Sequence, residues 1–228
     1  MSIANNVHRV INDIHEAAFR ANRDPSEIEL VAVSKTRTVR EIEEAVEAGI
    51  VHIGENRVQE ASLKIPQVSG KVIWHMVGHL QSNKAKTAVG LFDWIDSVHS
   101  KKIADIVSAL VSQDKRTVNT LIQVNISGEE SKFGVNMDEV KDLIIYAAGK
   151  KGINVCGLMT IGSFGVTPDI THDEFSRMND FFNRLKDDPE VGSVMNVLSM
   201  GMSGDFQIAI EEGSTMVRVG TAIFGKRN

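Results

Sequence analysis

The chain has 228 residues, of which 42% are hydrophobic and 24% are charged, and its formal net charge at pH 7 is −5. This composition is typical of a globular protein with a sizeable core, and the negative charge argues against nucleic acid and anionic membranes as partners. The single cysteine, Cys156, excludes an intramolecular disulfide, and no apolar run is long enough to cross a bilayer. We therefore expect a cytoplasmic protein.

The first predicted element is a helix over about residues 3–22, in which apolar residues recur at helical spacing and which ends before Asp24-Pro25. Eight units follow, each a strand and then a helix or loop. The predicted strands cover residues 30–35, 51–54, 72–77, 94–98, 120–126, 153–160, 194–199 and 215–219. The predicted helices between them lie near residues 39–48, 58–63, 81–84, 101–113, 137–149, 173–185 and 208–210.

This repeating order predicts the fold. Eight strand-then-helix units without a linker or a change of composition favour a single-domain (β/α)8 TIM barrel spanning residues 1–228, with the N-terminal helix of residues 1–22 packed on it. A doubly wound open sheet has the same alternation. The sequence has no G-x-G-x-x-G after any predicted strand, which makes a dinucleotide-binding open sheet the weaker alternative.

The end of the first predicted strand carries a candidate nucleophile. Residues 30–33 are all apolar, as in a strand buried on both faces, and Lys35 follows them. An amine that is partly desolvated there, with Arg37 nearby, loses its proton more easily than a free lysine and can form a Schiff base with a carbonyl. The alternative is a solvated lysine that only marks the end of the strand.

The loops after the seventh and eighth predicted strands are candidates for holding a phosphate, as they often do in barrels of this kind. They contain residues 199–204 and 220–221. Their glycines let the backbone approach a phosphate, and the hydroxyls of Ser199, Ser203 and Thr221 can donate hydrogen bonds to it. The alternative is two ordinary loops in which glycine serves the turns and serine caps a helix.

Arg218 interrupts the apolar eighth strand and therefore requires a partner, either a carboxylate such as Asp96 or an acceptor atom of a ligand.

His75 and His79 are four residues apart, but they lack the glutamate of H-E-x-x-H and fall on a predicted strand and loop. We expect no metal site.

Seven segments, in this order, resemble the pyridoxal phosphate homeostasis proteins, the YggS/PROSC family. They are VAVSKT at 31–36, IGENRVQE at 53–60, WHMVGHLQSNK at 74–84, SGEESKFG at 127–134, GLMT at 157–160, LSMGMS at 198–203 and VRVGTAIFG at 217–225. The resemblance implies a barrel similar to the N-terminal domain of alanine racemase. It also implies that pyridoxal 5′-phosphate (PLP) is bound as a Schiff base on Lys35.

The resemblance also implies roles for further residues. The phosphate cradle would consist of Ser199, Gly201, Ser203, Gly220 and Thr221. Arg218 would face the pyridine nitrogen, and Asn56 would line the ring or its hydroxyl. Lys132 matches a loop lysine of the family whose role stays open. Arg37 stands where many relatives have lysine and cannot form an imine.

A pyridine nitrogen that faces arginine should stay unprotonated, which makes the cofactor a poor electron sink. Racemases of this barrel type take a second catalytic residue from an additional β domain, and this sequence ends at Asn228, soon after the last predicted strand. We therefore expect a non-catalytic, monomeric protein that buffers PLP or delivers it to apoenzymes in transient contacts. The alternatives are a one-domain racemase with Lys35 as anchor and base, and a Schiff-base aldolase for a phosphorylated sugar without a cofactor.

Overall fold

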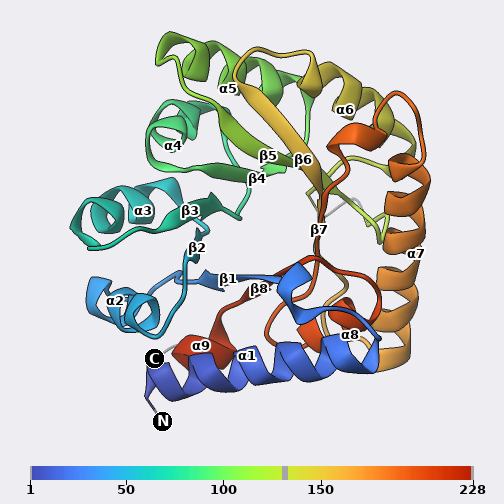
Figure 1. Ribbon diagram of the computed structural model, residues 1–228. Helices are drawn as coiled ribbons and strands as arrows, with labels where there is room; N and C mark the ends of the chain where they lie inside the picture. The colour runs from blue at the N-terminus through green and yellow to red at the C-terminus, as the bar shows by residue number, and fades with distance from the viewer. Residues whose placement is uncertain (1, 130–132, 227–228) are drawn as a thin grey trace.

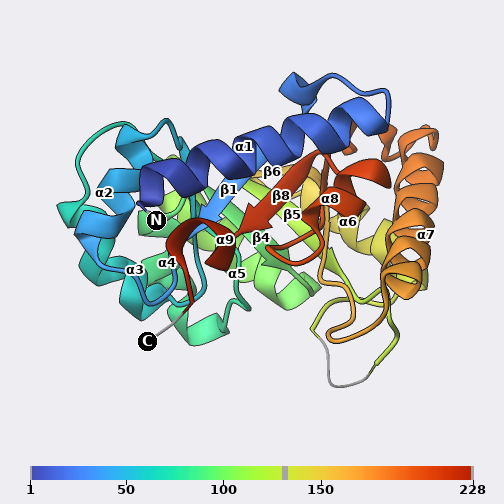
Figure 2. The same cartoon turned by 90° about the horizontal axis from the view of Figure 1, so that it is seen from below.

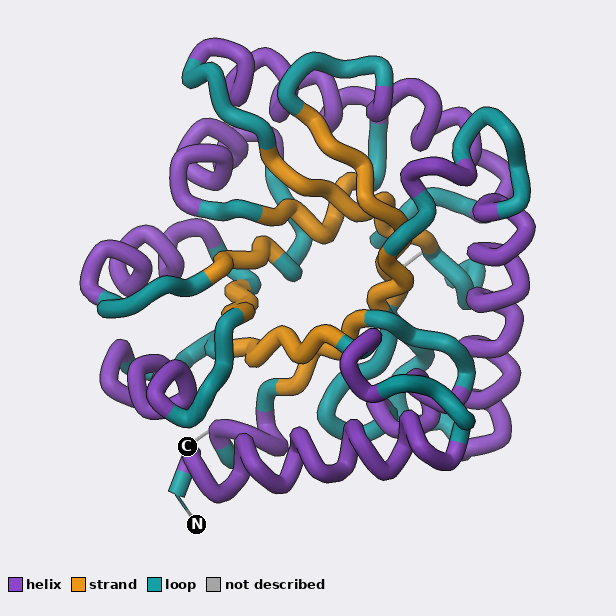
Figure 3. Tube along the Cα trace, viewed as in Figure 1, coloured by secondary structure: helices purple, strands orange, loops and turns teal. Residues whose placement is uncertain are grey.

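The computed structural model describes residues 2–129 and 133–226, and its centre is a closed barrel of eight parallel strands in sequence order. The barrel is closed because β1 pairs with both β2 and β8, and Figures 1 and 3 show the resulting ring of strands. The strands are β1 (Glu29–Val33), β2 (His52–Glu55), β3 (Ile73–Met76), β4 (Trp94–Val98), β5 (Val118–Val124), β6 (Ile153–Thr160), β7 (Val197–Ser199) and β8 (Met216–Val219). The predicted barrel is confirmed, and a closed ring excludes the open sheet.

Helices surround the barrel, with α2 to α7 following one another around it (Figure 1). The α-helices are α1 (Ile3–Arg20), α2 (Val39–Glu47), α3 (Val58–Lys64), α4 (Ala85–Leu91), α5 (Lys101–Gln113), α6 (Val140–Ala148), α7 (Pro168–Lys186), α8 (Phe206–Glu211) and α9 (Thr221–Phe224). Short 3-10 helices are η1 (Pro25–Glu27), η2 (Ile65–Gln67), η3 (Ser82–Lys84), η4 (Met137–Glu139) and η5 (Gly192–Val194). None of the helices in the described part of the chain is long and apolar enough to span a membrane.

The N-terminal helix α1 packs against α2, α8 and α9, and Figure 2 shows it lying across the barrel. Its first turn is capped by Ser2, whose Oγ accepts a hydrogen bond from the backbone N–H of Asn5. Its buried residues Val7, Val10 and Ile14 recur at helical spacing, as the sequence predicts. This helix covers the side of the barrel where the chain passes through α8 and α9.

Buried apolar side chains form two clusters, one on each side of the ring of strands. One apolar cluster lies between the strands and the helices, and a second lies inside the ring of strands. The second cluster contains Val31 and Val33 of β1, whereas Ala32 belongs to the outer cluster. Because side chains alternate along a strand, Lys35 continues the inner side and Ser34 the outer side.

Candidate functional site

A cavity of about 530 Å³ lies at the C-terminal end of the barrel, a size typical of small-molecule sites. It brings together six of the eight predicted site residues, which are Lys35, Asn56, Ser203, Arg218, Gly220 and Thr221. The other two, Ser199 and Gly201, are not among the lining residues, although both bond to Arg218. Lys132 lies outside the described residues.

Lys35 occupies a tight turn directly after β1. The backbone N–H of Arg37 donates a hydrogen bond to the carbonyl of Ser34 at 3.0 Å, which closes the turn. Lys35 is half-buried and lines the cavity. Arg37 does not line it, because its guanidinium is bonded to Glu41 of α2 and to the carbonyl of Gly225.

Arg218 projects into the barrel from β8 and is only 4% exposed. Its Nη1 donates to Ser199 Oγ at 2.6 Å, and its Nη2 donates to the carbonyl of Thr160 at 2.7 Å. Burial lowers the pKa of the Arg218 guanidinium to about 10, although Asp96 and Asp205 act in the opposite direction. A fixed positive charge therefore borders the cavity at neutral pH.

The loop between β7 and α8 forms another wall of the cavity. Ser203 Oγ accepts hydrogen bonds from the backbone N–H groups of Gly220 and Ala222, at 3.0 and 3.3 Å. Gly201 has φ +94°, and a Cβ there would lie 2.5 Å from Ala209 Cβ of α8. Only glycine fits at this position without displacing α8. The predicted glycine and serine residues thus shape this loop.

Asn56 lines the cavity from the turn between β2 and α3. The backbone of Gly78, after β3, packs so closely on it that a Cβ at Gly78 would overlap the carbonyl oxygen of Asn56. Glycine at this position allows two neighbouring strand ends to approach each other. The turn that carries Asn56 is therefore held in place by the backbone of Gly78.

Sequence reasoning missed the wall formed by the β6–α7 loop, where Ile161, Ser163 and Phe164 line the cavity. The loop is held by Glu174 of α7, which accepts hydrogen bonds from both the backbone N–H and the Oγ of Ser163. It also missed Asp205, a lining residue whose carboxyl pKa is raised by burial. Its position directly after the glycine-rich segment at 199–204 was the available signal.

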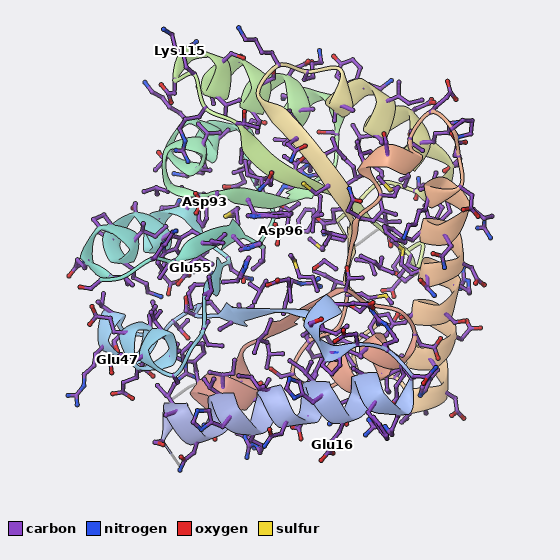
Figure 4. The ribbon with its side chains drawn as sticks, in the orientation of Figure 1. Glu16, Glu47, Glu55, Asp93, Asp96 and Lys115 are labelled. Atoms are coloured by element: carbon purple, nitrogen blue, oxygen red, sulfur yellow. The ribbon has the colours of Figure 1, made fainter. Side chains whose placement is uncertain are left out.

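A chain of polar side chains lies deeper in the barrel. His75 Nδ1 is 3.1 Å from Asp96 Oδ2, and His75 Nε2 is 2.9 Å from His52 Nδ1. His52 Nε2 lies 3.1 Å from Glu29 Oε2 at the start of β1. Figure 4 shows Asp96 directed toward the middle of the ring of strands. In the described part of the chain, no group of three or more His, Cys, Asp or Glu residues could hold a metal ion.

Comparison with known sequences places the chain in a family. The family model described as alanine racemase, N-terminal domain, matches residues 12–228. The pyridoxal phosphate homeostasis protein of Pasteurella multocida is 40% identical over 233 residues, covering 100% of this chain and 99% of that protein. The homeostasis protein of Escherichia coli is also 40% identical over 233 residues, with 99% and 97% covered.

The chain belongs to the pyridoxal phosphate homeostasis proteins. One solved structure related to this family is PipY of Synechococcus elongatus with PLP bound, which is 34% identical and has a TM-score of 0.80. The match covers 93% of this chain and 100% of the PipY chain. Alanine racemase of Clostridium difficile in complex with cycloserine has a TM-score of 0.78 at 14% identity. That match covers 98% of this chain but 60% of the racemase, and it shows the barrel fold alone. The resemblance seen in the sequence is confirmed for family and fold.

Proposed function

We propose that the protein binds PLP as a Schiff base on Lys35 and takes part in PLP homeostasis, by buffering or delivery, without substantial turnover of amino acids. One observation carries this proposal. A single cavity is lined by Lys35, by the buried Arg218, and by a wall formed of Ser203, Gly220 and Thr221. When bound, PLP supplies an aldehyde, a ring nitrogen and a phosphate, which these three sets of groups match.

The strand order supports these roles. Because β1 pairs with β8, the turn of Lys35 lies beside the loop that begins at Gly220, and a Cβ at Gly220 would lie 3.2 Å from the carbonyl oxygen of Val33. Ser203, Gly220 and Thr221 would hold the phosphate. The Lys35 amine would bond to the aldehyde carbon, whose oxygen leaves as water.

The remaining lining residues complete the proposed assignment. Arg218 would face the ring nitrogen, held there by Ser199, and Asn56 would line the ring. A buried guanidinium next to the ring nitrogen disfavours protonation of that nitrogen and so weakens carbanion chemistry. This fits a holding protein better than a racemase.

The comparisons also support a homeostasis role. The two curated relatives described above are matched over 97–99% of their length, whereas the alanine racemase is matched over 60% of its chain. We infer that a monomer holds PLP and passes it to PLP-dependent apoenzymes in transient contacts. Recovery of activity by a PLP-free acceptor enzyme, measured with PLP-loaded protein, tests the delivery step.

The decisive test of binding is the visible absorbance of purified protein after PLP addition, for the wild type and for Lys35→Ala. We expect the wild type to turn yellow and, after borohydride reduction, to carry the pyridoxyl label on Lys35 in peptide mapping. Lys35→Ala should lose the trapped label entirely, while Lys86→Ala, at an exposed position on α4, should retain it. A colourless, unlabelled wild type would overturn the proposal.

Turnover is tested separately, by NMR of alanine in deuterated water with the PLP-loaded protein. We expect no sustained exchange of the α-proton. Sustained exchange that disappears in Lys35→Ala would replace the binding role by the one-domain racemase.

A further inference from the structure

A buried group of charged residues lies under the turn that carries Lys35, between the strands and α3. Lys64, the last residue of α3, is 8% exposed, and Glu55, the last residue of β2, is fully buried. Lys64 Nζ lies 2.9 Å from Glu55 Oε1 and 2.5 Å from Glu60 Oε1. Figure 4 shows Glu55 beside β2 and β3, on the side of α3. None of the three residues lines the cofactor cavity.

This group holds the residue before Lys35. The carbonyl of Ser34 accepts a hydrogen bond from Lys64 Nζ at 2.9 Å. Ser34 Oγ donates to Glu55 Oε1 at 2.6 Å, and the Ser34 backbone N–H donates to the carbonyl of Gly54 at 2.9 Å. Ser34 is therefore fixed through its N–H, its hydroxyl and its carbonyl.

The same group holds the residue after Lys35. Thr36 has φ +65°, a left-handed conformation that is unfavourable for a β-branched residue and that the surroundings must enforce. Its backbone N–H donates to Glu60 Oε1 at 2.5 Å, and the same carboxylate oxygen contacts Lys64. The backbone on both sides of Lys35 is thus anchored through Lys64.

Attaching α3 to the barrel through these buried charged groups carries a free-energy cost. Charged groups lose solvation on burial, and Glu55 Oε2 has no hydrogen-bond partner among the described residues. Apolar side chains of similar size would join helix and strands at a lower free-energy cost. They could not, however, bind the Ser34 carbonyl or anchor the Thr36 N–H.

We propose that Lys64 and Glu60 are positioning residues that hold the Lys35 turn in the conformation in which the Lys35 amine faces the cavity. This inference rests on the proposed function, because the consequence considered is the capture of PLP. Neither residue lines the cavity. Both act through the backbone of Ser34 and Thr36.

The test measures two properties of Lys35. Stopped-flow absorbance gives the rate of covalent PLP capture by cofactor-free protein, and trace labelling with acetic anhydride followed by peptide mapping gives the reactivity of the Lys35 amine without PLP. The variants are Lys64→Met, Glu60→Gln and the conservative Lys64→Arg. The matched control is Lys86→Met on the exposed face of α4. Near-UV circular dichroism and urea unfolding establish the folded fraction of each.

We expect Lys64→Met to slow PLP capture by about ten-fold or more per folded molecule and to change Lys35 labelling relative to the other lysines. Glu60→Gln, which keeps an acceptor oxygen for Thr36 and should fold, should show a smaller change in the same direction. Lys64→Arg should recover part of the rate, and Lys86→Met should match the wild type.

Two outcomes separate this inference from the proposed function. If the wild type captures PLP and the folded fractions of Lys64→Met and Glu60→Gln capture it at the same rate with unchanged Lys35 labelling, the residues are merely structural and the inference is overturned. If the wild type captures no PLP, the proposed function fails, and the labelling of Lys35 still decides whether Lys64 and Glu60 position its amine.

Discussion

Two serines of one sequence segment have different surroundings in the structure. The resemblance assigns Ser199 and Ser203 the same role, in a phosphate cradle. Ser203 lines the cavity and accepts N–H hydrogen bonds from the loop after β8, whereas Ser199 is fully buried and accepts a hydrogen bond from Arg218. The geometry therefore favours a role for Ser199 in holding the guanidinium and a role for Ser203 at the ligand.

This distinction predicts different effects of alanine at the two positions. Ser199→Ala removes a partner of a buried charged donor, so the free energy of unfolding should fall by about 1–3 kcal/mol. Ser203→Ala should mainly weaken PLP binding. Urea unfolding and PLP titration measure the two effects, with the exposed Ser69→Ala as the control. Equal stability of Ser199→Ala and Ser69→Ala would contradict the role given to Ser199.

At the scale of elements, the register between β5 and β6 shifts within the barrel. Thr120 pairs with Val155, but Leu121 pairs with Gly157, so Cys156 is an extra residue on β6. This bulge leaves Cys156 half-buried, whereas Val155 and Gly157 on either side of it are buried. Gly157, with φ +150°, packs against β7 so closely that a Cβ would overlap the carbonyl oxygen of Val197.

Gly157→Ala should therefore strain the β6–β7 pairing and lower the free energy of unfolding by about 3 kcal/mol. A matched control is Gly149→Ala at the end of α6, where φ is −73° and the nearest atoms lie 3.6 Å from the added Cβ. That change should stay within about 1 kcal/mol of the wild type. Urea unfolding of both variants checks the prediction, and similar stabilities would contradict it.

The sequence predicts the elements that a residue pattern within the segment itself determines. Residues 94–98, 101–113 and 153–160 match β4, α5 and β6 as predicted, because apolar periodicity marks them clearly. The start of α7 was predicted five residues late, at 173, although Pro168 at the first position of the helix was a local signal. Residues 194–196 were predicted as strand, but η5 extends to residue 194 and β7 begins only at residue 197.

The site was predictable only in part, and for a physical reason. Strand ends and glycine-rich loops mark Lys35, Arg218 and the loop at 199–204, because a parallel barrel places such segments at one end. Hydrogen bonds between residues many positions apart in the chain leave no pattern in a single sequence. The bonds of Lys64 to the Ser34 carbonyl and of Ser163 to Glu174 belong to this class.

At the scale of the whole molecule, the chain of Glu29, His52, His75 and Asp96 extends through the barrel from the start of β1 toward Arg218. Glu29 is exposed, whereas His75 and Asp96 are fully buried. When a neutral His75 donates its Nδ1–H to the Asp96 carboxylate, its Nε2 is left to accept the Nδ1–H of His52. Burial removes water from around the His52 imidazole, and this disfavours its protonated, charged form.

Acid should therefore destabilise the protein through His52. Burial, and secondly His75, lower its pKa below the ordinary value, against the weaker opposing effects of Glu29, Asp96 and Asp93. The unfolded chain takes up the His52 proton near its ordinary pKa of about 6.5, whereas the folded protein does so only at lower pH. Between these two pKa values the unfolded state binds more protons, so this contribution to stability is present above about pH 6.5 and is lost as the pH falls toward the folded-state pKa.

His52→Gln removes this titration and keeps a polar side chain at the position. The free energy of unfolding of the wild type should therefore fall more steeply than that of His52→Gln between about pH 7.5 and about pH 5.5, as measured by urea unfolding at a series of pH values. His8→Gln, at an exposed position of α1, is the control and should keep the wild-type slope. If His52→Gln also keeps that slope, the acid sensitivity has its origin elsewhere. The buried imidazole chain would then carry no linkage between protonation and folding.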